Sequence, residues 1–270
     1  MVVGYEIEDG VAFVTLRRPP VNALGLELRT ALLSALQRAA TEPAVLALVL
    51  CGDGRGFSAG GDLREFGTPR VLAAPRLTLH LHPIIEGFAK PIVAALHGFA
   101  LGGGLETAMA CHYRVACADT RIALPEVGVG VIPLSGTQRL PRLIGMAAAL
   151  DMIVGARQRQ AQEFAIGTLF ERLVAPGDIE GLRRAAAALA RAAVANGTWP
   201  RTRDRGIDIT SAQTALDAKR AAMAADADTT EVQRLAVQAI AAVLECIDFD
   251  AGMQRANDIC EALLAAQPRR

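Results

Sequence analysis

Two glycine-rich turns are the features of this sequence best suited to chemistry. Gly60-Gly61 and Gly102-Gly103-Gly104 each follow an apolar run, and glycine lets a backbone approach a ligand closely. A helix that begins at Gly103 or Gly104 presents unpaired N–H groups and the positive end of its dipole. Such a site stabilises a phosphate or a developing oxyanion, and two turns can each supply one N–H to the same oxygen. The alternative is that the glycines only permit tight turns and close packing, because neither turn has a Walker or Rossmann spacing.

Two glutamates accompany these turns. Glu106 lies in the first turns of the expected helix among apolar neighbours, where desolvation raises the pKa of a carboxyl group. Glu126 stands in a second apolar stretch, directly after Pro125. If the two carboxyl groups face each other, they cannot both ionise easily, and one then acts as base and the other as acid. The alternative for Glu106 is an interaction with the helix dipole on a solvated face, and spacing alone does not establish that the two acids meet.

The elements that position these residues occur twice. An apolar run over Val45–Cys51 leads into the first turn, and a run over Ile92–His97 leads into the second turn and a helix. Continuous apolar runs predict strands that are buried on both faces. The turns lie 42 positions apart, and a third unit of this kind begins with Arg114–Ala118 and Arg121–Leu124. Successive strand, turn and helix units predict a mixed α/β core stacked in layers.

The two ends of the chain differ in their patterns. Asp9-Gly10 between two apolar runs predicts a hairpin, and Leu26–Ala40 has a helical period. The composition changes after residue 197, and three helices are expected beyond it: Ser211–Ala224, Thr230–Leu244 and Asp248–Ala266. We therefore divide the chain into a catalytic core, residues 1–197, and a C-terminal helical region, residues 198–270.

Composition and charge exclude several classes of protein. The 28 basic and 28 acidic residues balance, so no electrostatic footprint points to nucleic acid or to an anionic membrane. The apolar stretch Pro91–Cys111 contains His97 and Glu106, which predicts a buried strand and helix rather than a membrane span. The five cysteines lack zinc-site spacing and indicate free thiols in a reducing cytoplasm. His80 and His82 stand two apart in helical surroundings, so we expect no metal site there.

Several segments resemble the hallmark motifs of the crotonase (enoyl-CoA hydratase/isomerase) superfamily. They are Gly56-Phe57-Ser58-Ala59-Gly60-Gly61-Asp62-Leu63, Lys90–Ala95, Gly98–Glu106, Leu124–Gly128 and Gly136–Gly145. Three more are similar to the multifunctional β-oxidation enzymes, in their hydratase portion or the segment after it: Pro19–Ala23, Cys111–Val115 and Phe249–Met253. The resemblance implies an α/β fold, a crotonase-like core of repeated ββα units with a C-terminal helical region.

The resemblance also implies a function, that of an enoyl-CoA hydratase. The N–H groups of Gly61 and Gly103 would form an oxyanion hole for the thioester carbonyl, and Glu106 and Glu126 would add water across the C2–C3 double bond of a 2-enoyl-CoA. The backbone around four residues would hold the coenzyme A portion: Ser58, Ala59, Asp62 and Leu63. Coenzyme A enters as part of the acyl-CoA substrate, so no separate cofactor is expected. Standalone relatives are commonly trimers or hexamers, whereas the tail here resembles the fused, non-hexameric type, so the question of a homo-oligomer stays open.

The chain departs from the family pattern after Pro133. Only Leu134-Ser135-Gly136 stand before Thr137, where the family usually has one residue more and a higher content of glycine or alanine. In the family this turn lies against the second glutamate and helps to place the catalytic water. The shortened turn keeps two alternatives open. One is a Δ3-Δ2-enoyl-CoA isomerase, which shuttles a proton but needs no water, and the other is a catalytically impaired acyl-CoA-binding subunit.

Overall fold

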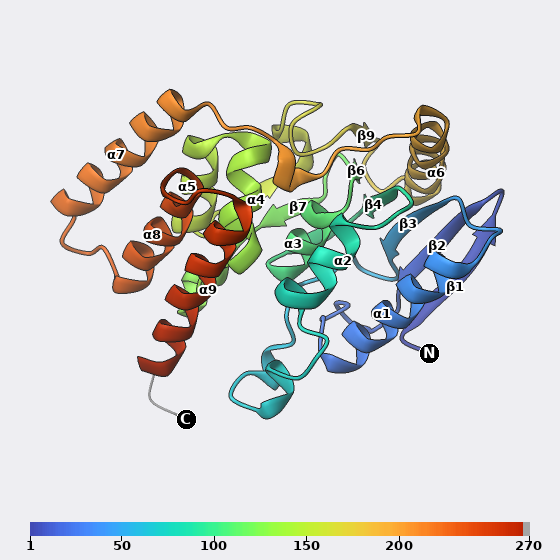
Figure 1. Ribbon diagram of the computed structural model, residues 1–270, viewed down its shortest axis with the longest axis horizontal. Coiled ribbons are helices and arrows are strands. Elements are labelled where there is room, and N and C mark those ends of the chain that lie inside the picture. The colour runs from blue at the N-terminus through green and yellow to red at the C-terminus, as the bar shows by residue number, and fades with distance from the viewer. Residues whose placement is uncertain (267–270) are drawn as a thin grey trace. The chain divides into compact units, whose positions relative to one another are not determined.

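The computed structural model describes residues 1–266 (Figure 1). These residues group into two compact units. The first unit comprises residues 1–122 and 159–202, and the second comprises residues 123–158 and 203–266. The division expected at residue 197 follows a change in composition rather than these contacts, and it stays a prediction.

A six-stranded sheet forms the centre of the first unit, with the order β1-β2-β3-β4-β6-β9. Its strands are β1 (Val3–Glu8), β2 (Val11–Leu16), β3 (Ala47–Gly52), β4 (Ile92–Leu96), β6 (Tyr113–Cys117) and β9 (Arg172–Val174). The first pair is antiparallel and every later pair is parallel. Asp9 and Gly10 in the first turn both have positive φ, +47° and +79°, which confirms the predicted hairpin. Because β3 and β4 are parallel, the loops that follow them leave the sheet at the same edge.

One face of this sheet packs against α6 (Ile179–Asn196), which lies along it in Figure 1. Alternate strand residues point toward the helix, as the pleat requires. They are Val11, Phe13, Ala47, Val49, Val93, Ala95, Val115 and Cys117. The helix side of this core is Leu182 with four alanines, which let the helix lie close to the strands. β3 has buried side chains on both faces, as its continuous apolar run predicted.

Three further helices belong to the first unit. α1 (Leu26–Thr41) packs on β1 and β2 and buries an apolar stripe, which confirms the predicted helix. α2 (His82–Glu86) follows a π-helical turn, Leu77–Leu81, and packs against α3 (Gly103–Ala110). Short 3₁₀ turns lie elsewhere in the chain, at Leu63–Glu65, Pro69–Val71, Glu126–Val129, Ala161–Glu163 and Thr202–Asp204.

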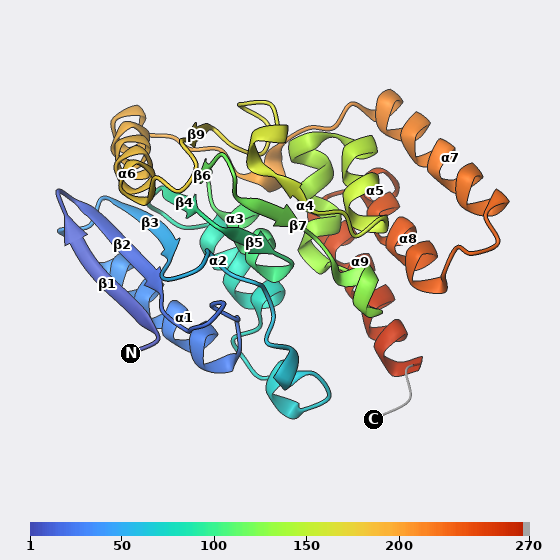
Figure 2. The same ribbon diagram turned by 180° about the vertical axis from the view of Figure 1, so that it is seen from behind.

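A second, three-stranded sheet has the order β5-β7-β8, and its strands β5 and β7 are labelled in Figure 2. Its strands are β5 (Phe99–Leu101), β7 (Arg121–Ala123) and β8 (Arg159–Gln160). The sequence predicted no strand between the apolar run Ile92–His97 and the turn Gly102–Gly104, whereas the structure places β5 there. The chain bends between β4 and β5 at Gly98, where φ is +61° and a Cβ would collide with the Arg55 carbonyl. A strand of three residues is too short to give a periodic signal.

The second unit is largely helical. It contains α4 (Leu134–Ile144), α5 (Met146–Val154), α7 (Ile209–Ala225), α8 (Glu231–Glu245) and α9 (Phe249–Ala266). The last three confirm the helices predicted near the C-terminus. α8 begins at a capping box made by Thr230 and Gln233, and Asp208 caps α7. α4, α8 and α9 pack against one another.

The apolar stretch Pro91–Cys111 folds into β4, β5 and α3, so the prediction of a buried strand and helix is confirmed. Within residues 1–266, no helix combines the length and the apolar character that a membrane crossing needs.

Candidate active site

The two glycine turns lie side by side because the strands before them continue to pair. Beyond the main sheet, Ser58 forms an isolated parallel bridge with Ala100. These residues are 42 positions apart, the same separation as Gly61 and Gly103. The pairing therefore carries the two chains forward in register and brings the two turns together.

Glycine is required where the turns touch. A Cβ on Gly60, whose φ is +89°, would lie 2.7 Å from the Leu101 carbonyl oxygen and 2.8 Å from the backbone nitrogen of Gly103. A Cβ on Gly103 would lie 3.5 Å from the backbone nitrogen of Gly61. A side chain at Gly60 would thus fill the space between the two backbones.

Hydrogen bonds on the neighbouring carbonyls orient the two N–H groups. The Gly60 carbonyl accepts from the Leu24 N–H at 2.8 Å, and the Gly102 carbonyl accepts from the Glu106 N–H at 2.9 Å. Both peptides are trans, so the N–H groups of Gly61 and Gly103 point away from these partners. Among residues 1–266, neither N–H donates to a protein acceptor. The predicted turns therefore present two adjacent donors.

The loop before Gly60 is held by Asn22, which is 2% exposed. Its amide nitrogen contacts three carbonyl oxygens at 2.9–3.2 Å, those of Asp53, Gly56 and Phe57. The Asn22 backbone carbonyl accepts from the Ser58 hydroxyl at 2.7 Å. The Ser58 hydroxyl oxygen in turn accepts from the Gly60 N–H at 3.1 Å. The sequence alone indicated no such role for Asn22.

Two acids hold the segment that follows Gly61. The Asp62 carboxylate accepts two hydrogen bonds from the Arg64 guanidinium at 2.9 Å and lies 2.8 Å from Arg18. These contacts, with Arg64 contributing most, hold the pKa of Asp62 well below its usual range. Both Glu65 carboxylate oxygens accept from the Leu26 N–H, at 2.8 and 3.0 Å, and so satisfy the start of α1. The Asp62 carboxylate is thus bound by protein groups. The sequence did not indicate Glu65, because its partner Leu26 lies 39 residues away.

The other predicted coenzyme A contacts lie along the same loop. Ser58 is fully buried, the half-buried Ala59 donates its N–H to the Val21 carbonyl at 2.9 Å, and Leu63 is 68% exposed. Their role in binding stays a prediction.

Apolar side chains border the two donors. Phe66 Cε2 lies 3.6 Å from the position of a Cβ on Gly61, and Leu77 Cδ1 lies 3.0 Å from that on Gly103. Apolar neighbours reduce the competition of water for a nearby hydrogen-bond donor. The sequence predicted no site residue in either of the segments that contain Phe66 and Leu77.

The two glutamates come from different units. Glu106 lies in the first turn of α3, whose eight residues are all buried, and its side chain is 5% exposed. Glu126 begins a 3₁₀ turn that packs on α5 and α8 in the second unit, and its carbonyl accepts from the Val131 N–H at 3.1 Å. The shortened segment Leu134–Gly136 forms the first turn of α4. That the two carboxyl groups face each other stays a prediction.

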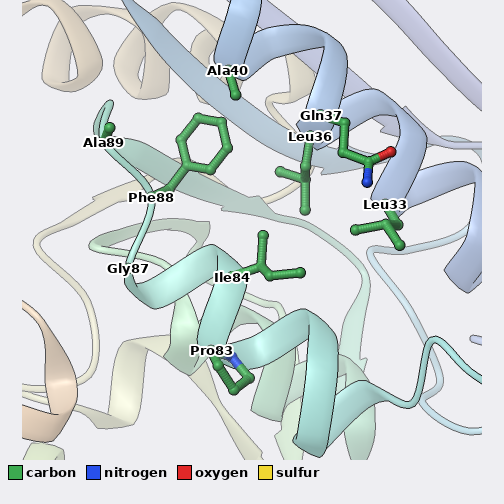
Figure 3. A pocket seen from close by; sticks show the side chains of 9 residues that line it. All are labelled: Leu33, Leu36, Gln37, Ala40, Pro83, Ile84, Gly87, Phe88 and Ala89. Carbon is green, nitrogen blue, oxygen red and sulfur yellow. The ribbon is translucent and has the colours of Figure 1, made fainter.

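A separate groove of about 420 Å³ lies between α1 and the segment Pro83–Ala89 (Figure 3). Leu36, Ile84 and Phe88 point into it, and none of the predicted site residues lines it.

The two histidines for which the sequence predicted no metal site have hydrogen-bond partners within the protein. His80 accepts from the Arg76 N–H at 3.0 Å, and His82 bonds to Thr107.

A family model described as enoyl-CoA hydratase/isomerase matches residues 6–239. The chain belongs to this family. Among curated proteins, it is 48% identical over 158 residues to a peroxisomal bifunctional enzyme of Danio rerio, an alignment that covers 58% of this chain and 22% of the relative. It is 45% identical over 157 residues to a probable enoyl-CoA hydratase of Bacillus subtilis (strain 168), covering 56% and 60%. The chain thus spans at most 60% of the length of either relative.

The solved enoyl-CoA hydratase from Bacillus anthracis matches 100% of this chain and 93% of its own, with a TM-score of 0.64 and 25% identity. Membership of the hydratase/isomerase family confirms the resemblance and the α/β fold that the motifs predicted. The similarity to a bifunctional enzyme agrees with the resemblance of Pro19–Ala23 and Cys111–Val115 to multifunctional enzymes.

Proposed function

We propose that this chain is an enoyl-CoA hydratase of fatty-acid β-oxidation, which adds water across the C2–C3 double bond of a 2-enoyl-CoA thioester. One observation carries the proposal: Gly61 and Gly103 present adjacent N–H groups that no protein acceptor within residues 1–266 uses. The names of the relatives support it, because they include a probable enoyl-CoA hydratase and a peroxisomal fatty acid β-oxidation multifunctional protein.

In this reaction the thioester carbonyl oxygen lies against the two N–H groups. Attack of water at C3 moves negative charge onto that oxygen, and the two donors stabilise it. Losing one such donor typically lowers the rate by about 10²–10³-fold. The Leu24 and Glu106 N–H groups hold the adjoining carbonyls, so the donors need little rearrangement as the charge develops.

The two glutamates move the protons. One carboxylate takes a proton from water as the water oxygen attacks C3. The other glutamate, as a carboxylic acid, delivers a proton to C2. Glu106 stands on the helix that begins at Gly103, so one acid and one donor share the same short helix. The position of Glu126 opposite Glu106 is part of the proposal.

We further propose how coenzyme A is bound and where the protein acts. The backbone around Ser58, Ala59, Asp62 and Leu63 holds the coenzyme A portion, which enters and leaves with the acyl group, so no separate cofactor takes part. Five free cysteines and the bacterial relative support a cytoplasmic location. Whether the chain forms a homo-oligomer, a trimer or a hexamer, stays open.

The test is hydration of crotonyl-CoA by the wild type and by Glu106→Gln and Glu126→Gln. Removing an acid–base group should lower kcat by about 10²–10⁴-fold. Glu27→Gln is the matched control, because Glu27 is an exposed acid in the first turn of α1. If Glu106 only complemented the helix dipole, Glu106→Gln would behave like this control.

Other outcomes would identify the alternatives. Conversion of a 3-enoyl-CoA to the 2-enoyl isomer, with Glu126 essential and Glu106 dispensable, would assign an isomerase. Calorimetric binding of a CoA thioester without turnover of either isomer would assign an acyl-CoA-binding subunit and overturn the hydratase proposal.

A further inference from the structure

A buried chain of hydrogen bonds leads from α2 to Gly103. His82 Nε2 lies 3.1 Å from the Thr107 hydroxyl, and both residues are 0% exposed. The same hydroxyl lies 2.7 Å from the Gly103 carbonyl oxygen, one turn earlier in α3. His82, which precedes Thr107 by 25 residues, thus reaches a backbone group of the candidate site through one threonine.

The number of available protons determines the direction of donation along these hydrogen bonds. A carbonyl oxygen only accepts, so the single hydroxyl proton of Thr107 is directed at Gly103. The hydroxyl oxygen can then only accept from the imidazole, and His82 Nε2 must carry a proton. The order of donation is therefore from His82 to Thr107 to Gly103.

Gly103 needs such support, because it has no side chain to restrict its φ and ψ. The peptide before it is held through the Gly102 carbonyl by the Glu106 N–H. The peptide after it receives the Thr107 hydroxyl, and Leu77 lies over its α-carbon. Leu77 and His82 both belong to the segment 77–86, so one segment contacts Gly103 and supports it through Thr107.

We propose that His82 and Thr107 are positioning residues, which hold Gly103 so that its N–H points at the developing oxyanion. This inference rests on the proposed function, since it assigns a role to groups beside the hole. Neither side chain is a proton donor or acceptor for the substrate. Their loss should reduce stabilisation of the transition state more than binding of the thioester.

The test compares near-isosteric variants that remove or keep the hydrogen bonds. Thr107→Val and His82→Leu should lower kcat for crotonyl-CoA about 10-fold with KM changed less than about 3-fold, a smaller loss than removal of an oxyanion donor. Thr107→Ser and His82→Gln retain the hydroxyl and a side-chain N–H, so their kcat should stay within about 3-fold of wild type. The double variant His82→Leu/Thr107→Val should be no slower than Thr107→Val, because both changes interrupt one chain.

A second readout does not depend on turnover. In ¹⁵N-labelled wild type, NMR should show a protonated His82 Nε2 whose resonance shifts in Thr107→Val. An unprotonated Nε2, or a wild-type kcat in Thr107→Val and His82→Leu, would overturn the inference while leaving the hydratase proposal intact. Absence of hydration by the wild type would instead overturn the proposed function, and the NMR result would still decide whether the chain of hydrogen bonds exists.

Discussion

Among single residues, Asn22 makes hydrogen bonds to loop carbonyls that a neighbouring strand would make in a sheet. The loop between β3 and Gly60 lies beyond the sheet's main ladder, and the Asn22 amide nitrogen shares its two N–H donors among three of the loop's carbonyl oxygens. Its own oxygen accepts from the Arg18 N–H at 2.8 Å, and its backbone has a φ of +52°. Asparagine suits both demands, because its short amide both donates and accepts and because it tolerates the left-handed region.

Asn22→Asp should therefore destabilise the protein at neutral pH. The substitution keeps the size and one acceptor oxygen but turns a carboxylate toward three carbonyl oxygens. Leaving buried groups without donors costs about 1–3 kcal/mol, and a charge costs more, so we expect a loss of roughly 3 kcal/mol. The loss should shrink at pH 5, because a protonated acid can donate one hydrogen bond.

Urea unfolding of wild type and variant at pH 8 and pH 5 measures this difference. A loss below about 0.5 kcal/mol at pH 8 would show that water replaces the amide, and the assigned role would be wrong.

At the scale of elements, three helices of the second unit meet at Gly252. Gln138 on α4 is fully buried and donates to the Ala239 carbonyl on α8 at 2.8 Å. A Cβ on Gly252 of α9 would collide with the Gln138 amide oxygen and lie 3.5 Å from the Ala242 carbonyl oxygen. A glycine inside a helix costs about 1 kcal/mol relative to alanine, and here that cost allows close packing of α9.

Gly252→Ala should reduce the free energy of unfolding, despite the better helix propensity of alanine. Overpacking costs about 1–3 kcal/mol, so we expect a net loss of up to about 2 kcal/mol after the gain of about 1 kcal/mol in propensity. The matched experiment adds Gly252→Ala to Gln138→Ala, where the colliding amide is absent. There the same change should be neutral or stabilising, and an equal loss in both backgrounds would mean that Gln138 is not the obstacle.

Acid stability is a property of the whole molecule, and His112 contributes to it by joining separate segments of the first unit. Its Nδ1 accepts from the Ile92 N–H at 2.9 Å, so its Nε2 donates to the Glu86 carbonyl at 3.1 Å. Trp199 packs edge-on against the ring, with centroids 5.9 Å apart. Burial, the largest cause, lowers the pKa of His112 to about 4, because the charged form loses its hydration.

Acid should therefore destabilise the protein through His112. The unfolded chain binds this proton below about pH 6.5 and the folded chain only near pH 4, so stability falls as the pH drops between these values. The expected contribution is about 2 kcal/mol lost between pH 8 and pH 5. His112→Gln can keep both hydrogen bonds without titrating, so its unfolding free energy should change less over this range.

Urea unfolding across this range compares the two proteins, and parallel pH profiles would contradict the assignment. The Asp62 carboxyl does not interfere, because its depressed pKa matters only below its ordinary value of 3.8.

Much of the fold was predictable because its signals are local. Asp9-Gly10 encodes a hairpin through positive φ, Val45–Cys51 encodes a doubly buried strand, and the three C-terminal helices follow their apolar period. The strand Phe99–Leu101 was missed, because three residues carry no period and its pairing partners lie elsewhere in the chain.

Residue types and spacing were enough to identify the groups that can do the chemistry: two glycine turns 42 residues apart and two glutamates in apolar surroundings. That Gly61 and Gly103 are neighbours depends on the fold, because parallel pairing of Ser58 with Ala100 joins segments that are distant in sequence. The fold also decided which residues support them, namely Asn22, Glu65 and the His82–Thr107 pair. A buried polar side chain is satisfied by whichever backbone group the fold brings within reach, and that partner leaves no trace in local sequence.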